Sequence, residues 1–373
     1  MLSLLGVTKE EHMADREVLL VTGSSGFLGH AMCHHFGSNG YDVIGFDNAG
    51  PPYPPPNTDG LFCDLTDDES LQKTFHIVRT EYGRKIKAVI HLAAYYSFSG
   101  EDSPLYKKLT VDGTGRLLRE LENFDVGQII FSSSMLVHKP NEKGALLTED
   151  SPIGPTWAYP KSKVETEKLL AQNHGRIPVV ILRIAGVYDN VCHSIPIAHQ
   201  IQRIYEDQLE AHLYPGDLEA RQSFVHVNDV VSACQSVIDS VDELPPLSTF
   251  LIGEPEPMSY EELQKEIGAL IYGSGWTTLR IPKPIAWAGA EVESLLPGKK
   301  EQFIRPWMID RASDNFELDI TRAALDLGWM PRERLSTTLP KMIEGLKMDP
   351  LRFYKINKLH PPKWLLDRER RSA

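Results

Sequence analysis

The stretch VLLVTGSSGFLGH, residues 18–30, decides the fold of this 373-residue chain. Its four leading apolar residues predict a buried parallel strand, and an amphipathic run that reaches Phe36 predicts a helix behind it. Between them, Gly23 permits a sharp turn, Gly26 lets backbone N–H groups approach a pyrophosphate, and Gly29 lets the helix pack closely on the strand. The positive N-terminus of the helix faces the phosphates. The stretch therefore predicts a dinucleotide site.

Composition narrows the class of protein. The formal net charge is −12 with neutral histidines, which argues against nucleic acid as a partner. No window offers about 18 uncharged apolar residues, and residues 1–16 lack the pattern of a signal peptide, so a cytoplasmic location is expected. The cysteines are dispersed without metal-type spacing, and no metal site is predicted. We interpret them as free thiols in a reducing compartment: Cys33, Cys63, Cys192 and Cys234.

The second and third predicted strands each end near a carboxylate. Residues 41–47 predict the second strand, and Asp47 at its end suits the two hydroxyls of an adenosine ribose and repels a 2′-phosphate, which favours NAD over NADP. The alternative is that Asp47 only forms a turn before Asn48. Residues 61–64 predict a short third strand, and Asp64 either reaches the adenine edge or caps a helix that begins near Asp67. Between these strands, the proline-rich residues 51–56 predict a stiff surface loop.

Polar groups follow later strands of the same predicted sheet. Residues 87–94 predict a strand whose small residues leave room for a flat cofactor, and a helix is expected over 104–123. The next strand, 126–131, ends in Ser132-Ser133-Ser134. Because open α/β sheets bind ligands at the carboxyl edge, this serine triplet is a candidate active-site position.

Tyr159 and Lys163 form a second candidate constellation. Four residues apart on a helix they share a face, so the Lys163 ammonium is expected near the Tyr159 phenol. A nearby cation stabilises a phenolate and lowers the tyrosine pKa, which makes Tyr159 a candidate general acid or base. Ser134 could hydrogen-bond the substrate oxygen. In isolation this spacing is common on solvated helices; it gains weight from the Gly-rich stretch upstream.

In order and spacing, these motifs resemble the extended short-chain dehydrogenase/reductase superfamily, also called the NAD-dependent epimerase/dehydratase family. The resemblance covers about residues 16–345. It rests on the Gly-rich stretch, Asp47, Asp64, the serine triplet and Tyr159-x-x-x-Lys163, and on further segments. Those segments are 91–94, 179–188, 221–230, 318–323 and 327–331.

The resemblance implies an α/β fold: a Rossmann-type doubly wound parallel sheet that carries NAD, with a smaller C-terminal substrate-binding lobe. The expected division is an N-terminal tail 1–16, an NAD domain 17–190 with a returning segment near 221–255, a lobe mainly over 191–345, and a basic tail 346–373. By position, Ser134, Tyr159 and Lys163 are catalytic. The expected cofactor residues are Gly23, Ser25, Gly26, Phe27, Leu28, Asp47, Asn48, Asp64, Leu65, Leu92, Ala93, Ala94, Tyr159 and Lys163. The expected substrate residues are Tyr95, Ser134, Met135, Arg221 and Arg311.

Three departures from the family pattern concern the substrate. Gly186 and Thr110 stand where nucleotide-sugar members usually carry Asn, and His138 stands where many carry Tyr. By contrast, Arg221 and Arg311 favour a nucleotide sugar if they bind its diphosphate; the alternative is that they pair with carboxylates of the lobe.

The apolar helix expected near 281–290 resembles one in hydroxysteroid-dehydrogenase-like members. It either packs within the lobe, which we favour, or roofs a lipophilic pocket or touches a membrane surface.

The chain is accordingly predicted to be an NAD-dependent oxidoreductase of a secondary alcohol or ketone. The alternative is a nucleotide-sugar 4-epimerase with tightly bound NAD, and a non-catalytic NAD-binding scaffold is disfavoured because Tyr159 and Lys163 are both present. Dehydratase chemistry would need an acidic pair beside the serine triplet, where the chain has Met135 and Leu136. The substrate is expected to be a nucleotide sugar or a lipophilic alcohol. His226 is interpreted as structural. The basic tail is interpreted as a solvated, partly docked terminus, with a contact to a membrane surface or a partner as the alternative. A homodimer through helices near 104–123 and 157–174 follows from the resemblance alone.

Overall fold

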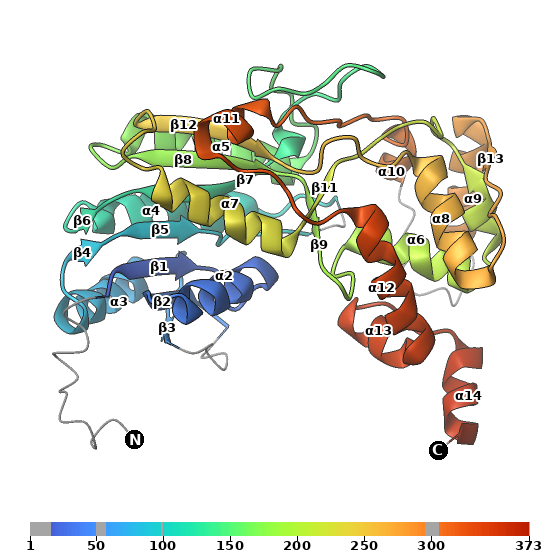
Figure 1. Cartoon of the computed structure of the whole chain (residues 1–373), viewed down its shortest axis with the longest axis horizontal. Coiled ribbons are helices and arrows are strands. Elements are labelled where there is room, and N and C mark those ends of the chain that lie inside the picture. The colour runs from blue at the N-terminus through green and yellow to red at the C-terminus, as the bar shows by residue number, and fades with distance from the viewer. Residues whose placement is uncertain (1–15, 50–56, 98–99, 295–305, 373) are drawn as a thin grey trace.

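The computed structural model describes residues 16–49, 57–97, 100–294 and 306–372, and Figure 1 shows a sheet-containing part beside a largely helical lobe. Seven parallel strands form the main sheet in the order β12-β8-β7-β5-β1-β2-β3. The order reverses on either side of β1, as in doubly wound folds. The predicted Rossmann-type sheet is therefore confirmed. Its strands are β1 (Val18–Thr22), β2 (Asp42–Asp47), β3 (Thr58–Phe62), β5 (Ala88–His91), β7 (Ile129–Ser134), β8 (Val179–Ile184) and β12 (Leu247–Ile252).

Helices cover both faces of this sheet because successive residues of a strand point to opposite sides. Leu19 and Val21 of β1 pack in one hydrophobic core with α2 (Phe27–Ser38), α7 (Val227–Asp239) and α11 (Thr321–Leu327). Val18 and Leu20 pack in the other core with α3, α4 and α5. Those three helices span Asp68–Glu81, Asp112–Leu121 and Ala158–Asn173. A strand that is apolar on both faces needs this double cover.

Local details refine several expectations. The helix after β3 has Asp67 as its N-cap, whose side chain accepts the Glu69 N–H, so Asp64 does not cap it. The helix expected over 104–123 consists of a π-helical stretch, Tyr106–Val111, that runs into α4. Wider helical turns of this kind are often found at functional sites. The proline-rich residues 51–56 lie outside the described residues.

The lobe has its own hydrophobic core, built from segments far apart in the sequence. Buried side chains of α6, α8 and α12 meet there, together with Phe353, Tyr354 and Leu365 from the C-terminal residues. Figure 1 shows α13 and α14 continuing from α12 at the lobe's outer end. The lobe helices are α6 (Ile195–Tyr205), α8 (Tyr260–Tyr272), α9 (Lys283–Ser294), α10 (Pro306–Asp310), α12 (Leu335–Met348), α13 (Pro350–Ile356) and α14 (Lys363–Ser372).

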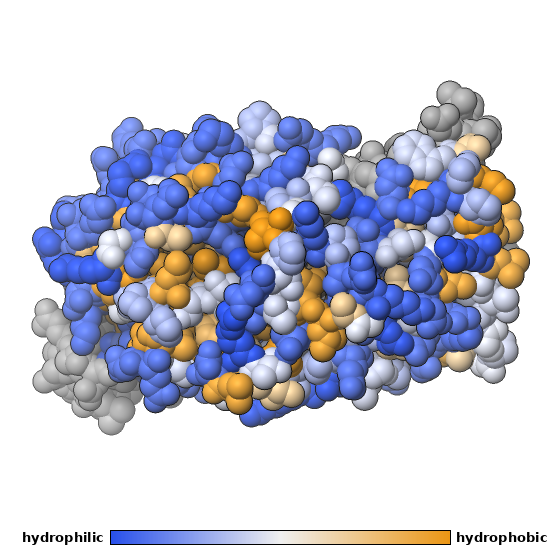
Figure 2. All heavy atoms as spheres, turned by 90° about the horizontal axis from the view of Figure 1, so that it is seen from above, coloured by the Kyte–Doolittle hydropathy of each residue, from blue (hydrophilic) through white to orange (hydrophobic). Residues whose placement is uncertain are grey.

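Short strands form three further two-stranded pairings. They join β4 (Lys85–Ile86) to β6 (Asp125–Val126), β9 (Gly186–Tyr188) to β11 (Phe224–His226), and β10 (Leu213–Tyr214) to β13 (Leu279–Arg280). The β9–β11 pair carries the chain from the sheet into the lobe. On the face seen in Figure 2, hydrophobic patches are separated by hydrophilic side chains. Among the described residues, none of the helices has the length and apolar character needed to span a membrane.

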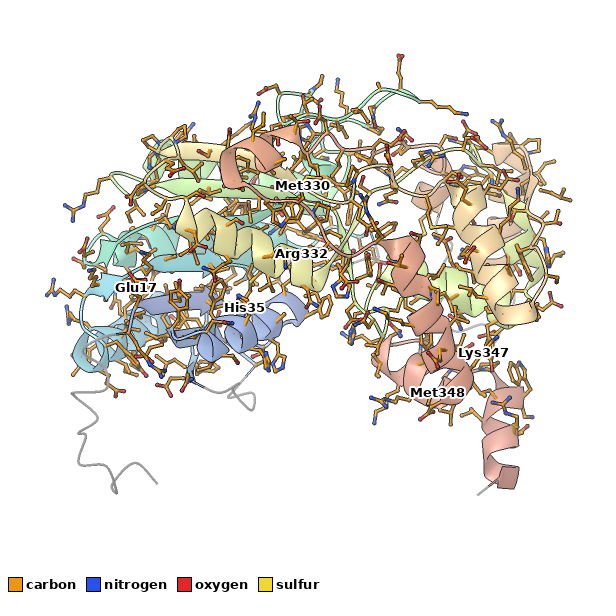
Figure 3. All side chains as sticks on the ribbon, viewed as in Figure 1. Glu17, His35, Met330, Arg332, Lys347 and Met348 are labelled. Carbon is orange, nitrogen blue, oxygen red and sulfur yellow. The ribbon has the colours of Figure 1, made fainter. Side chains whose placement is uncertain are left out.

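Asp229 of α7 links the sheet domain to the lobe. Its carboxylate accepts hydrogen bonds from the backbone N–H groups of Arg332 and Glu333, both at 3.0 Å. Figure 3 labels Arg332 at the passage between the two parts, between Glu17 and His35 on the sheet side and Lys347 and Met348 on α12. Asp229 is 2% exposed, so removing it costs two partly buried hydrogen bonds between the two parts of the molecule.

Candidate active site

The Gly-rich turn lies at the carboxyl end of β1, as predicted. Gly23 has φ +73°, and its N–H bonds to the Phe46 carbonyl of β2 at 2.8 Å. A Cβ on Gly29 would lie 2.0 Å from the Gly23 oxygen, so only glycine permits this approach of helix to turn. Gly26 is the N-cap of α2 and supplies no side-chain cap. The first N–H groups of α2 are therefore available to an anion.

The carboxylate of Asp47 stands beside this turn. Oδ2 accepts the Ser25 N–H and Oδ1 accepts the Ala49 N–H, both at 2.9 Å. The Ser25 hydroxyl is buried without a hydrogen-bond partner among the described residues. A buried orphan hydroxyl indicates a group that is supplied from outside the chain. The turn, the orphan hydroxyl and the ribose-type carboxylate together fit a dinucleotide cofactor.

The other expected cofactor residues lie at the ends of β2, β3 and β5. Asn48 is exposed beside Asp47, and Asp64 accepts the Thr66 N–H at 2.8 Å. The Leu65 side chain is buried in the core, so only its backbone can face a cofactor. Leu92 and Ala93 donate their N–H groups to Thr22 Oγ1, each at 3.2 Å. The structure thus brings Leu92 and Ala93 against the turn, and Ala94 lines the neighbouring cavity.

His91 fixes the position of Thr22, to which the backbone of residues 92 and 93 is bound. Thr114 donates its hydroxyl proton to the Thr110 carbonyl at 2.6 Å, so its oxygen must accept from His91 Nε2 at 2.8 Å. Nδ1 then accepts from Thr22 at 2.7 Å. Burial and the Lys163 charge lower the pKa of His91 to about 3. A neutral imidazole with one defined tautomer therefore fixes Thr22, which in turn holds the backbone of residues 92 and 93.

Ser134, Tyr159 and Lys163 converge at the carboxyl end of β7. Lys163 Nζ donates to the Ser132 carbonyl at 2.6 Å and lies 5.8 Å from the centroid of the Tyr159 ring. Burial lowers the pKa of Lys163 to about 7. Burial also raises the pKa of Tyr159 to about 12, although a hydrogen bond with Ser134 acts in the opposite direction. The expected lowering of the Tyr159 pKa by Lys163 is therefore not found in this arrangement, where burial is the largest cause and raises this pKa.

A buried polar network stands behind these residues. Glu167, two helical turns after Tyr159, forms an ion pair with Arg183 at 2.8 Å and accepts the Ser133 hydroxyl at 2.5 Å. Arg183 also bonds to His138 Nε2 at 3.0 Å. The Glu167 charge raises the pKa of Lys163 against the effect of burial. The network therefore fixes the end of β7 and favours the ammonium form of Lys163.

A cavity of about 600 Å³ opens beside Tyr159, between the sheet and the lobe. The side chain of Tyr96 contacts Tyr159, with ring centroids 4.8 Å apart, and Trp157 lies 5.5 Å from Tyr159. The neighbouring Tyr95 instead packs its ring on Tyr106 at 4.8 Å. Tyr96 and Trp157 were missed from the sequence; alternation along an extended segment after β5 was the available signal for Tyr96.

The expected substrate residues lie around this cavity in different ways. Met135 lines it close to Ser134. Arg221 also lines it but pairs with Glu262 at 3.2 Å and donates to the Pro257 carbonyl. Arg311 donates to the Thr156 hydroxyl. Several further lining residues from the lobe were not predicted from the sequence: His193, Arg203, Tyr214, Met258, Tyr260 and Met308.

The two histidines singled out earlier are structural in their contacts. His226 is the N-cap of α7, and its Nδ1 accepts the Asn228 N–H at 3.2 Å. His138 Nε2 accepts a hydrogen bond from Arg183, and its Nδ1–H donates to the Ser151 carbonyl, both at 3.0 Å. Within residues 16–49, 57–97, 100–294 and 306–372, no cluster of three His, Cys, Asp or Glu side chains could hold a metal ion.

A family model described as the NAD dependent epimerase/dehydratase family matches residues 19–253. The chain belongs to this family. UDP-glucose 4-epimerase of Streptomyces lividans is 25% identical over 235 residues, 57% of this chain and 69% of that protein. The 3-beta-hydroxysteroid dehydrogenase/Delta 5→4-isomerase of Mycobacterium tuberculosis is 25% identical over 343 residues, 88% of this chain and 89% of that protein.

The fold is also found in solved structures. The dTDP-glucose 4,6-dehydratase of Bacillus anthracis, solved in complex with NAD, has a TM-score of 0.67 at 17% identity, covering 91% of this chain and 99% of that one. The family match and the relatives show that the present chain is an NAD-dependent enzyme of the short-chain dehydrogenase/reductase superfamily.

Proposed function

We propose that this enzyme oxidises a lipophilic secondary alcohol, or reduces the corresponding ketone, and releases the product. The observation that carries the proposal is the apolar and aromatic lining of the cavity beside Tyr159. Trp157, Tyr96, Met135, Met258 and Met308 all face it. Such a surface favours a large apolar substrate over a sugar.

Packing at Gly186 supports the same choice. A Cβ there would lie 2.7 Å from the Phe224 ring. A larger side chain, such as the Asn expected in nucleotide-sugar members, does not fit unless Phe224 moves. The steroid dehydrogenase of M. tuberculosis also aligns over a much larger share of this chain than the S. lividans epimerase.

Each active-site group has a separate role in the proposed reaction. NAD, held at the Gly-rich turn, supplies the hydride acceptor or donor at nicotinamide C4. Ser134 orients the substrate oxygen, and Tyr159 takes the hydroxyl proton during oxidation or gives it during reduction. Lys163 holds the end of β7 through the Ser132 carbonyl. Tyr96 and Trp157 supply apolar surface for the substrate beside Tyr159.

The test is absorbance near ~340 nm with NAD and matched panels of sterol-like alcohols and sugar nucleotides. Net NADH formation with an alcohol, reduced roughly 100-fold or more in Tyr159→Phe while NAD binding is kept, is expected. Because burial raises the pKa of Tyr159 to about 12, oxidation should still be rising with pH above pH 9. An oxidation rate that reaches a plateau near neutral pH contradicts Tyr159 as the base.

A second candidate, nucleotide-sugar 4-epimerase, is supported by the arginines in the cavity wall, Arg203, Arg221 and Arg311. Guanidinium groups suit a diphosphate. Formation of a sugar-nucleotide isomer without net NADH in the same assay selects this candidate and rejects the first. The expected homodimer stays a prediction, and sedimentation at micromolar concentration tests it.

A further inference from the structure

The loop after β9 presents a histidine to the cavity in a constrained conformation. Asp189 and Cys192 exchange two backbone hydrogen bonds, each at 3.1 Å, which closes a tight turn. The backbone is strained at the end of this turn: Cys192 has φ +89° and His193 has φ +44°, although neither residue is glycine. Non-glycine residues adopt such angles only where surrounding contacts hold them, and such positions gather at ligand sites.

Asn357, the C-cap of α13, supplies those contacts. Its Oδ1 accepts the His193 N–H at 2.8 Å, and its Nδ2 donates to the Val191 carbonyl at 3.0 Å. Asn357 is 8% exposed, so both bonds are shielded from water. Lys341 of α12 bonds to Asn190 at 3.5 Å. The C-terminal helices therefore fix the loop from the lobe side.

The His193 ring points to the Gly-rich turn of the other domain. Its centroid lies 4.9 Å from that of Phe27, the first residue of α2, and both residues line the cavity. Asp189 Oδ2 lies 2.7 Å from Nδ1. Nδ1 therefore carries a proton, and Nε2 on the opposite side of the ring makes no hydrogen bond within the part of the chain that the structure describes.

The N-terminus of α2 offers the complementary half of an anion site. The Gly26 cap leaves its N–H groups without a side-chain acceptor, and the orphan Ser25 hydroxyl is buried beside them. We propose that His193 is a cofactor-binding residue that donates Nε2–H to the pyrophosphate, so that the lobe and the Gly-rich turn hold the phosphates between them. Because Nδ1–H donates to Asp189, the contact with the phosphate is made through a hydrogen on Nε2.

Other cationic side chains of the cavity have different partners. Arg221 pairs with Glu262, and Arg311 bonds to Thr156. Arg203 interacts with Tyr260. These contacts tie the three arginines to the lobe or to the segment before α5. His193 is the ionisable cavity residue that contacts Phe27, which is why we assign it to the cofactor rather than to the substrate.

The test compares ADP-ribose, which contains the pyrophosphate, with adenosine, which lacks it, by titration calorimetry. His193→Phe keeps a ring against Phe27 but removes both nitrogens. We expect ADP-ribose to bind at least about tenfold more weakly, with adenosine binding unchanged within about twofold. His193→Lys, which restores a cation, should recover most of the ADP-ribose affinity. Asn357→Ala, which frees the loop, should weaken ADP-ribose severalfold.

His212→Phe is the matched control, because His212 is also a lobe histidine beside an aspartate, at 3.5 Å from Asp207 Oδ1, and does not line the cavity. It should leave both ligands unaffected. Unchanged ADP-ribose binding in His193→Phe overturns the proposal, and so does an equal loss for adenosine. UDP is titrated as a third ligand. If His193→Phe weakens only UDP binding, His193 contacts a substrate phosphate, and the proposal is likewise overturned. ADP-ribose lacks the nicotinamide ring and the test measures binding without an alcohol, so its outcome does not depend on the proposed alcohol chemistry.

Discussion

The two walls of the active-site cavity are built on different principles. The cofactor wall consists mainly of backbone, in the Gly-rich turn and at the ends of β2, β3 and β5, and each of these short segments directly follows a strand of the main sheet. The lobe wall consists of side chains from α6, α8 and the segments around residues 186 and 311, which are brought together only by the tertiary fold.

This difference determines what a substitution can do. A backbone site fails when the chain can no longer follow its path, so a single Cβ in the wrong place removes the whole site. A site built from side chains loses its contacts one at a time, with small and separable effects. The predictions below test this contrast from the largest expected effect to the smallest.

Gly29→Ala should have the largest effect. The new Cβ would lie 2.0 Å from the Gly23 oxygen and 2.7 Å from Ser24 Cα. Both are backbone atoms that cannot move without opening the turn. We expect the free energy of unfolding to fall by about 3 kcal/mol or more, and we expect NAD binding to be lost as well. Chemical denaturation measures the stability, and calorimetry measures NAD binding.

The matched control is Gly345→Ala in α12, where an added Cβ meets nothing within 4 Å. It should stabilise the protein by up to about 1 kcal/mol, because alanine is the better helix former. If Gly29→Ala proves as harmless as Gly345→Ala, the turn is not closely packed and the backbone account of the cofactor wall is wrong.

Lys163→Met should stabilise the fold while it impairs catalysis. Lys163 is 2% exposed, and burial lowers its pKa to about 7 from an ordinary value near 10.5. The unfolded chain thus binds a proton more tightly than the folded one, which penalises folding fully below pH 7 and not at all above about pH 10.5. The variant should gain on the order of 1–3 kcal/mol, less what the lost Ser132 bond contributed.

The pH dependence identifies the cause of that gain. Thermal unfolding should show the largest stabilisation near pH 6.5 and a shrinking one toward pH 10. A gain that is independent of pH would mean that packing, rather than the desolvated ammonium, explains the result. Lys161→Met, which alters an exposed lysine on the same helix, should change stability little at either pH.

Much of the cofactor wall could be predicted from the sequence, since each part depends on neighbours along the chain. The β1 turn, Asp47 at the end of β2 and the shared helix face of Tyr159 and Lys163 are local patterns. The electrostatics were not predictable in this way. Whether Lys163 lowers the pKa of Tyr159 depends on burial and on the Ser132 carbonyl, which come from tertiary structure.

The lobe wall was predicted less completely for the same reason. Arg221 could be named from a motif, but its pairing with Glu262 could not. His193 and Trp157 have no local pattern that marks them. The choice between Tyr95 and Tyr96 depends on the π-helical stretch 106–111, on which the Tyr95 ring packs. Periodicity predicted an ordinary helix there, and the wider turn could not be foreseen.

Asp47→Ser should change coenzyme choice with little effect on the fold. The carboxylate accepts two backbone N–H groups and repels a 2′-phosphate. We expect NAD to bind roughly ten- to a hundredfold more weakly and the preference for NAD over NADP to shrink. Asp42→Ser, at the other end of β2, is the control. An unchanged NAD to NADP ratio would leave Asp47 with only its turn-forming role.

Tyr260→Leu should have the smallest effect, because it removes one contact from a wall of many. The rings of Tyr260 and Tyr214 stack with centroids 3.6 Å apart and both line the cavity. Leucine offers the substrate less surface and leaves Tyr214 without its stacking partner, so KM should rise roughly two- to tenfold with kcat and NAD affinity unchanged. Tyr272→Leu is the matched control, since Tyr272 also stacks on an aromatic ring in the lobe, that of Trp276, but does not line the cavity. If Tyr260→Leu instead weakens NAD binding, the two walls are coupled, and the separation between a backbone-built cofactor site and a side-chain-built substrate site does not hold.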